Sequence, residues 1–240
     1  PLVLVDGIER PLDLVDPEDI ESFSILKDAT ATAVYGVRGA NGVLLITTRK
    51  GKEGKPRISV RAEAGILGPT KMPQMANSGQ WAEMYNEAYG YSHNGNKFYT
   101  DAVVQKYKDG SDPQLYPNVD WIDELYKDWA SNQRVNVNVS GGGSMVKYYV
   151  AGSLYNEGSV FREEKNKTLD YNSSINYSKI NFRANLDINV TRTTTLSVNL
   201  ATVYEKKNSP GKAGDVWGYA FHTSPNAFPL YYDNGYLSGP

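Results

Sequence analysis

The stretch that decides the fold is a run in which apolar and polar side chains alternate without a break: Ile180-Asn181-Phe182-Arg183-Ala184-Asn185-Leu186-Asp187-Ile188-Asn189-Val190-Thr191. Successive side chains of a β-strand point to opposite faces, so a period of two predicts one long strand with an apolar face and a polar face. The chain is 40% apolar. At that content, an unbroken match of this length arises by chance in roughly two of every ten thousand windows. The alternation therefore indicates a real strand.

The same period of two recurs on both sides of this stretch, and short links alternate with long ones. Short turns at one end and long loops at the other are the organisation of an outer-membrane β-barrel. The longest connection also contains three segments of helical pattern, residues 78–88, 101–108 and 121–129. We expect further strands at residues 58–64, 135–140, 145–155 and 196–204, short links at 141–144 and 192–195, and long connections at 68–132, 156–178 and from 208 onward.

Alternation alone does not say which face of the sheet is buried. A strand in a soluble sandwich would show the same period with its apolar face inward. Here the polar faces are mostly Asn, Ser and Thr, with Arg183 and Asp187 among them, which suits a wet lumen. The connections are also too unequal for a compact sandwich, where most are short. These two observations favour a barrel.

Composition excludes several classes of protein. The formal net charge of −2 gives no general attraction to nucleic acid, and no run approaches the roughly 18 apolar residues that a membrane-spanning helix needs. The chain has no Cys, which excludes disulfides, zinc thiolate sites and Cys nucleophiles. His93 and His222 lie in no metal-ligand pattern, so we expect no metal and no cofactor. The 18 Tyr residues suit places where a ring is apolar on one side and wet on the other.

The first 50 residues follow another pattern and predict a small mixed α/β unit. Asp6-Gly7 is a tight-turn pair, because Gly tolerates positive φ and Asp bonds its own backbone. Asp16 can cap a helix that begins at Pro17. Strands are expected at residues 2–5, 23–26 and 43–48, and a second helical turn is expected at 29–35, between Asp28 and Gly36. A basic, Gly-rich linker, residues 49–56, follows this unit.

Two groups of residues could carry chemistry but have simpler structural interpretations. Asp16, Glu18, Asp19 and Glu21 suit the positive end of a helix dipole, so we interpret them as helix-start residues and not as acid–base catalysts. A loop with Gly36, Gly39 and Gly42 could cradle an anion. Phosphate sites, however, run strand, loop, helix, and the order here is helix, loop, strand. These glycines therefore predict turns of positive φ.

The later part of the chain holds two further candidates. Asp120, Asp123 and Glu124 lie near tryptophans, as glycosidase carboxylates do, although a solvated helix face is the favoured interpretation. The last long connection is rich in aromatic residues that suit sugar or peptide ligands, and packing of the loop or an aromatic girdle remains an equal alternative. Its candidate substrate-binding residues are Trp217, Tyr219 and His222.

The stretch Ala33 to Thr48, with its Tyr-Gly, Arg-Gly-Ala-Asn-Gly and Thr-ended strand, is very similar to the most characteristic segment of SusC/RagA-type TonB-dependent outer-membrane receptors. Residues 1–7 and 17–29 resemble the strand–turn opening and the helix–strand step of their plugs. The resemblance is close over the first 50 residues and loose over the strands, through 139–142 and 208–210. It implies a plug loop with a gating role formed by Tyr35, Gly36, Arg38, Gly39, Asn41 and Gly42.

The resemblance implies a mainly β fold, with 22 antiparallel strands forming a multi-pass barrel around an internal plug in the bacterial outer membrane. Residues 1–55 would be the C-terminal part of the plug, and residues 56–240 would give about five strands with long outer loops. Five strands cannot close a barrel, and an open sheet edge is not viable in lipid, so we expect this chain to be a fragment. Arg183 and Asp187 would face the lumen and contact the plug.

The resemblance also implies active import of oligosaccharides or peptides without enzymatic chemistry. TonB, energised at the inner membrane, would pull a box that precedes the plug, and a SusD-like surface lipoprotein would present the ligand. Two other hypotheses stay open at this point. One is a soluble carbohydrate-binding β-domain without transport that uses the Trp and Tyr residues. The other is a hydrolase based on Asp120, Asp123 or Glu124.

Overall fold

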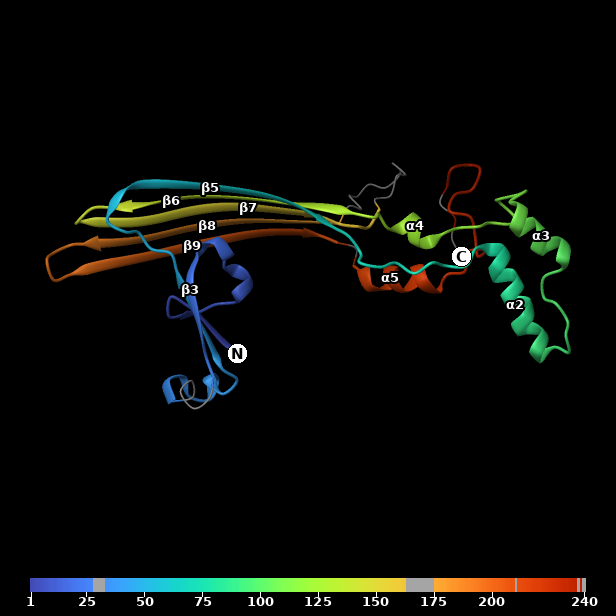
Figure 1. The fold of residues 1–240 in the computed structure, drawn as a ribbon, viewed down its shortest axis with the longest axis horizontal. Helices are drawn as coiled ribbons and strands as arrows, with labels where there is room; N and C mark the ends of the chain where they lie inside the picture. Colours follow the sequence, from blue (N-terminus) through green and yellow to red (C-terminus); the bar gives the residue numbers. More distant parts are fainter. Residues whose placement is uncertain (28–32, 163–174, 210, 237, 239–240) are drawn as a thin grey trace. The chain divides into compact units, whose positions relative to one another are not determined.

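The computed structural model describes residues 1–27, 33–162, 175–209, 211–236 and 238 (Figure 1). The chain divides into two compact units. The first contains Pro1–Ile66, Ser131–Gly158 and Asn176–Lys207, and the second contains Leu67–Ala130, Ser159–Ile175 and Asn208–Pro240. Each unit is described by itself. No helix in the described ranges is long and apolar enough to cross a membrane.

The first unit begins with a small four-stranded mixed sheet. Its strands lie in the order β2-β1-β4-β3, with β1 parallel to β4 and with β3 antiparallel to β4. The strands are β1 (Leu2–Val5), β2 (Ile8–Glu9), β3 (Ile20–Leu26) and β4 (Val43–Thr48). The turn between β1 and β2 has positive φ at both Asp6 and Gly7, 51° and 83°, as a tight hairpin turn requires.

Short 3-10 helices connect these strands: η1 (Leu12–Leu14), η2 (Pro17–Asp19) and η3 (Gly36–Gly39). Asp16 caps η2, because its carboxylate accepts the backbone N–H of Glu18 at 3.0 Å. Val43 and Ile46 of β4 are almost fully buried and give the small sheet its core. The expected helical turn at 29–35 lies partly in residues 28–32, which are outside the described ranges. Ala33 to Tyr35 are helical.

Five long strands form the second sheet of this unit, in the sequential order β5-β6-β7-β8-β9 (Figure 1). Their pairing is antiparallel where β7 meets β6 and β8. They confirm the strands expected from the period of two, although each is longer than expected. The strands are β5 (Gly54–Leu67), β6 (Ala130–Gly142), β7 (Val146–Gly158), β8 (Asn176–Asn189) and β9 (Thr195–Asn208).

Exposure on the two faces of this sheet is the reverse of that in a soluble sandwich. Six apolar side chains of the central strands are 40% to 49% exposed: Val135, Val137, Val146, Leu154, Ile180 and Phe182. The polar side chains that alternate with them are only 2% to 7% exposed: Asn136, Ser153, Asn181, Arg183 and Asn185. A soluble sandwich buries its apolar face. The hypothesis of a soluble β-domain with apolar residues inward is therefore wrong for this sheet.

The second unit is built from helices and loops. It contains α2 (Ser78–Ser92), α3 (Asp101–Asp109), α4 (Trp121–Leu125) and α5 (Ala213–His222), with Ile122, Tyr126 and Ala220 at the centre of one apolar core. The helix expected at 121–129 ends at Leu125. Beyond it the chain extends, and the backbone N–H of Lys127 donates to the Val160 carbonyl at 2.6 Å. This pairing with a distant segment replaces further helical hydrogen bonds.

Candidate functional site

The buried polar face of the long strands contacts the small mixed sheet through hydrogen bonds and ion pairs. Asp19 is at the centre of this contact and is 3% exposed. It accepts the Tyr149 hydroxyl at 3.0 Å from β7 and the Arg183 Nε–H at 3.0 Å from β8. Arg183 is equally enclosed, at 5% exposed, and its Nη1 lies 3.9 Å from a carboxylate oxygen of Asp6. The two sheets are thus joined by a buried pair of opposite charges.

Asp16 makes a second contact beside the first. Its carboxylate accepts the Ser153 hydroxyl of β7 and the Asn181 amide of β8, the latter at 3.2 Å. Ser153 and Asn181 face each other across β7 and β8 and are also hydrogen-bonded, at 3.0 Å. The guanidinium of Arg134 on β6 lies 3.9 Å from the same carboxylate. Asp16 therefore caps η2 and also binds three strands of the long sheet.

A third contact is made at the end of β4. The Asn185 amide donates to the Thr48 hydroxyl at 2.9 Å and to the Arg49 carbonyl at 2.8 Å. Thr48 in turn donates both its hydroxyl and its backbone N–H to Asp6, at 2.6 and 2.9 Å. The positive φ of Asp6 in the β1–β2 turn brings its carboxylate to this position. We call Asp6, Asp16, Asp19, Thr48 and their partners on β6, β7 and β8 the interlock.

The interlock keeps the carboxyl group of Asp19 away from water, and this burial affects its pKa. Burial raises the pKa of Asp19 above its ordinary value, because a charge is less stable away from water. The hydrogen bond from Tyr149 and the charge of Arg183 oppose this rise, and the negative charge of Asp16 adds to it. Asp19 and Arg183 consequently depend on each other, since either would be a buried unpaired charge without its partner.

Sequence reasoning found only part of the interlock. Arg183 contacts the small sheet as expected. The corresponding expectation for Asp187 is wrong, because its carboxylate accepts the Ser197 hydroxyl of β9 at 2.5 Å. The interpretation of Asp16 and Asp19 as helix-start acids is incomplete, although Asp16 does cap η2. The signal that could have found their partners is the Asn-x-Arg-x-Asn spacing of residues 181–185, which puts three polar side chains on one strand face.

The expected plug loop folds around two glycines of positive φ, Gly36 at 61° and Gly42 at 84°. A Cβ at Gly42 would lie 3.2 Å from the Leu26 carbonyl oxygen, so the turn is tight in space as well as in angle. Of the other loop residues, Tyr35 packs on the core around Leu4 and Val43, Arg38 pairs with Glu9, Gly39 is buried and Asn41 is exposed. The gating role of this loop stays a prediction.

The aromatic candidates of α5 have separate surroundings. Trp217 packs edge-on against Tyr126, with ring centroids 5.1 Å apart, beside the core of the second unit. Tyr219 is 67% exposed. His222 lines a small cavity of about 120 Å³ with Trp81 and Trp121. Their role in binding a substrate stays a prediction.

The acids proposed for hydrolysis lie at the start of helix α4, where one of them caps the helix. Asp120 caps α4, and its carboxylate accepts the backbone N–H groups of Ile122 at 3.0 Å and Asp123 at 3.2 Å. Asp123 and Glu124 are exposed in the first turn of that helix, where the dipole favours acids. Among the described residues, no group of three or more His, Asp or Glu side chains could hold a metal ion.

Comparison with known proteins gives the same assignment from end to end. Residues 1–43 match the family model of the TonB-dependent receptor plug domain. TonB-dependent receptor P26 of Formosa agariphila is 28% identical over 100% of this chain, and TonB-dependent receptor SusC of Bacteroides thetaiotaomicron is 25% identical over 98%. The chain spans 22% of the length of each of these relatives.

Solved structures agree with these relatives. The structure of the RagAB peptide transporter is similar over 99% of this chain, with a TM-score of 0.75 at 25% identity, and the chain covers 28% of the matched one. The closed-closed state of the RagAB peptide importer gives a TM-score of 0.71 over the same share. The small mixed sheet corresponds to the plug match, and the five long strands correspond to part of the RagA barrel. Residues 1–43 thus match a TonB-dependent receptor plug, and the whole chain is similar to the plug and N-terminal barrel region of SusC/RagA-type receptors.

Proposed function

We propose that this chain is the gate and part of the wall of a receptor that imports oligosaccharides or peptides across the outer membrane, driven by TonB. The observation that carries the proposal is the reversed sheet, whose apolar face is exposed and whose polar face is buried against the plug. An exposed apolar face suits lipid, and a polar face suits a lumen. Strands of 13 and 14 residues also exceed the 9–11 that a tilted barrel strand needs to cross a bilayer.

The interlock gives this proposal a mechanism. Hydrogen bonds and ion pairs hold the plug to the strands, and within the described residues no buried apolar cluster contains residues of both. Water can replace such contacts one by one as the plug moves, because polar groups regain hydrogen bonds on hydration. A pull by TonB on a segment that precedes the plug would break the contacts of Asp16 and Asp19, open a path along the polar face, and allow them to re-form afterwards.

The cargo class is the finer part of the proposal. One solved relative is described as a peptide importer, which supports peptides as cargo, and the resemblance to SusC/RagA-type proteins supports oligosaccharides as well. These relatives also support a SusD-like lipoprotein as a partner that presents the ligand. No covalent chemistry is required of any residue in this scheme, and the receptor acts as a transporter and not as an enzyme.

Uptake in whole cells tests the proposal. The full-length receptor would be expressed in a strain that lacks it, and accumulation of labelled peptides and oligosaccharides would be compared with and without TonB. Accumulation of one class that requires both the receptor and TonB is expected. A receptor that reaches the outer membrane but gives equal accumulation with and without TonB would refute TonB-driven import.

A further inference from the structure

A large cavity in the first unit lies where the linker leaves the plug, and among the described residues no acidic side chain pairs with its two arginines. The cavity measures about 830 Å³ and is formed by the linker together with β5, β6 and β7. This is within the range of about 300–1,000 Å³ that ligand sites occupy. Its lining contains more cations than acids. The cations are Arg49, Lys50, Lys52, Lys55 and Arg57, and the acids are Glu21 and Glu53.

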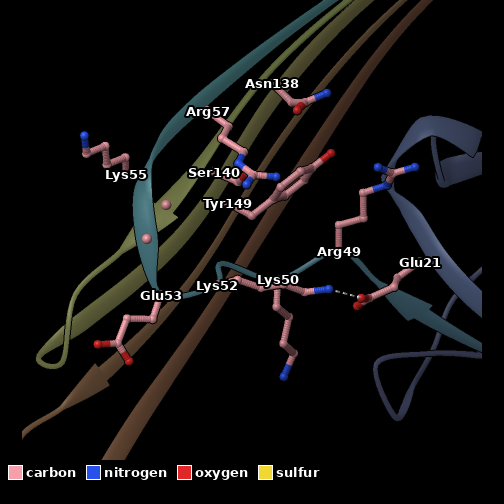
Figure 2. A pocket seen from close by; sticks show the side chains of 12 residues that line it. Glu21, Arg49, Lys50, Lys52, Glu53, Lys55, Arg57, Asn138, Ser140 and Tyr149 are labelled. Atoms are coloured by element: carbon pink, nitrogen blue, oxygen red, sulfur yellow. Dashed lines mark hydrogen bonds and ion pairs between the residues drawn. The ribbon is translucent and has the colours of Figure 1, made fainter.

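The charges of this cavity are not all equivalent. Lys52 is neutralised by Glu21, with Nζ and Oε1 3.1 Å apart. Figure 2 shows Lys50, Lys55 and Glu53 pointing outward, whereas Arg57 points toward the Tyr149 ring. Within the described residues, neither Arg49 nor Arg57 has an acidic group within 4.0 Å. Two guanidinium groups therefore border one cavity without an anion to balance them.

The walls of the cavity are held in place by short-range contacts. The backbone N–H of Arg49 donates to the Asp19 carbonyl at 2.8 Å, and its carbonyl accepts the Asn185 amide at 2.8 Å. The backbone N–H and C=O of Arg49 are thus both hydrogen-bonded, while the residue as a whole is exposed. At Gly51 the linker runs so close to β7 that an added Cβ would collide with the backbone of Tyr148. A fixed frame with free charges is what a preorganised anion site requires.

We propose that this cavity, which we call the linker pocket, binds a phosphate-type oxyanion between Arg49 and Arg57. Guanidinium groups present N–H donors in a planar fork that matches the oxygens of phosphate or sulfate. The hydroxyl of Ser140, which also lines the cavity, is a further donor. Because Arg49 belongs to the end of the plug and Arg57 to the first barrel strand, an anion held by both fastens the linker to the wall.

The anion could come from free phosphate or from the headgroup of an anionic lipid. The polar face of the sheet carries Asn138, Ser140 and Tyr149, and these line the cavity. The apolar face, which suits lipid, is the opposite one. This position favours a free anion, and the experiment separates the two sources. The proposal is independent of which cargo the receptor carries.

Trypsin cleavage of the linker in the purified full-length receptor tests the proposal without any transport readout. Cleavage after Lys50 and Lys52 would be followed by mass spectrometry at constant ionic strength, with chloride replaced stepwise by inorganic phosphate. We expect cleavage to slow about tenfold at a phosphate concentration ten times its Kd, because the bound state resists opening. A second set of cleavage reactions, in buffer without inorganic phosphate, would compare the receptor in nanodiscs of phosphatidylglycerol with the receptor in nanodiscs of phosphatidylcholine alone.

Three variants make the test specific. Arg49→Ala and Arg57→Ala are each expected to abolish the protection, and both leave Lys50 and Lys52 available for cleavage. Arg192→Ala, which removes an exposed arginine from the β8–β9 link, is expected to keep it. Protection by phosphate, or only by phosphatidylglycerol, supports the site and identifies the source. Absence of protection in every arm, or equal protection in all variants, would overturn the proposal. Phosphate titration followed by ³¹P NMR line width checks binding directly if a variant changes the basal cleavage rate.

Discussion

Replacing Asp19 with Ala removes the acceptor that neutralises Arg183 inside the interlock. Arg183 is 5% exposed, so water cannot take the place of the lost carboxylate without local opening. Breaking a buried ion pair by removing one partner costs about 3–5 kcal/mol. We expect about 3 kcal/mol, the lower end of that range, because Asp6 remains 3.9 Å from the Arg183 Nη1 and can take part of the charge.

That free energy converts into a measurable opening of the plug. A cost of about 3 kcal/mol corresponds to a roughly 150-fold rise in the population of plug segments detached from the strands. Hydrogen exchange in the full-length receptor reports this population through the amides of residues 12–27, whose protection is expected to fall by about two orders of magnitude. Asp13→Asn is the matched control, because the side chain of Asp13 is exposed in the same segment.

A double variant separates the ion pair from general damage to the plug. Replacing a buried pair with apolar residues is often neutral, so Asp19→Ala combined with Arg183→Met is expected to recover much of the lost protection. The coupling between the two positions should reach at least about 1 kcal/mol, as for residues in direct contact. Protection in Asp19→Ala within threefold of the unmodified receptor, or strictly additive losses in the double variant, would refute the assignment of the interlock as a buried pair.

Three further predictions follow from other parts of the structure. Phe182→Arg puts a charge on the lipid-facing side of β8 at a cost of about 2–4 kcal/mol, and should reduce the heat-modifiable folded band on gels. Val190→Arg, beyond the strand end, should cost only about 0–1 kcal/mol. Equal loss of the folded band in both variants would contradict the orientation of the sheet. Burial raises the folded-state pKa of Asp19, so the folded state holds this proton more tightly than the unfolded state does. The stability of the unmodified receptor relative to Asp19→Asn should therefore increase as pH falls through the folded pKa toward the ordinary value, and this gain should be lost as pH rises. The opposite slope in denaturant midpoints would show that the paired charge is favoured. Gly51→Ala forces a Cβ against the Tyr148 backbone and should displace the linker, so trypsin cleavage after Lys50 and Lys52 should be faster. Gly54→Ala should have a smaller effect, because Gly54 has open space around it, although its φ is positive. Unchanged cleavage in Gly51→Ala would mean that the linker does not lie on β7.

The strands could be predicted from the sequence because their signal is local. The alternation at 180–191 and the run at 43–48 each specify a strand without reference to the rest of the chain, and β4 has the predicted bounds. The strand predicted at 180–191 begins earlier, at Asn176, and ends at Asn189, so the prediction is wrong for Val190 and Thr191. β8 and β9 extend beyond their predicted ranges at ends made of residues such as Asn, Tyr and Lys, which break the alternation. Ladder pairing, not hydrophobic pattern, decides where these strands stop.

The interlock could not be predicted in full, because its partners are far apart in sequence. Asp19 and Arg183 are separated by 164 positions, and Asp16 and Ser153 by 137. The start of a helix is a sufficient local explanation for the presence of Asp16 and Asp19, so neither acid signals a distant partner. The helix α5 was missed for a different reason. Its glycines, Gly214 and Gly218, and its aromatic residues read as a loop, while packing of Trp217 and Ala220 on the core of the second unit favours the helix.

The central claim is that the plug must part from the polar face of the strands for cargo to pass. A pair introduced as Asp16→Cys and Ser153→Cys can be joined by a short thiol-reactive reducible cross-linker, and residues 1–240 contribute no other cysteine. The matched control joins Ser153→Cys to Asn181→Cys, which connects β7 to β8 at directly opposed positions and leaves the plug free of the link. We predict that cross-linking the plug to β7 stops TonB-dependent uptake and that reduction restores it, while the control pair transports at the same rate in either state. Full uptake through a receptor whose plug is covalently joined to β7 would contradict the account.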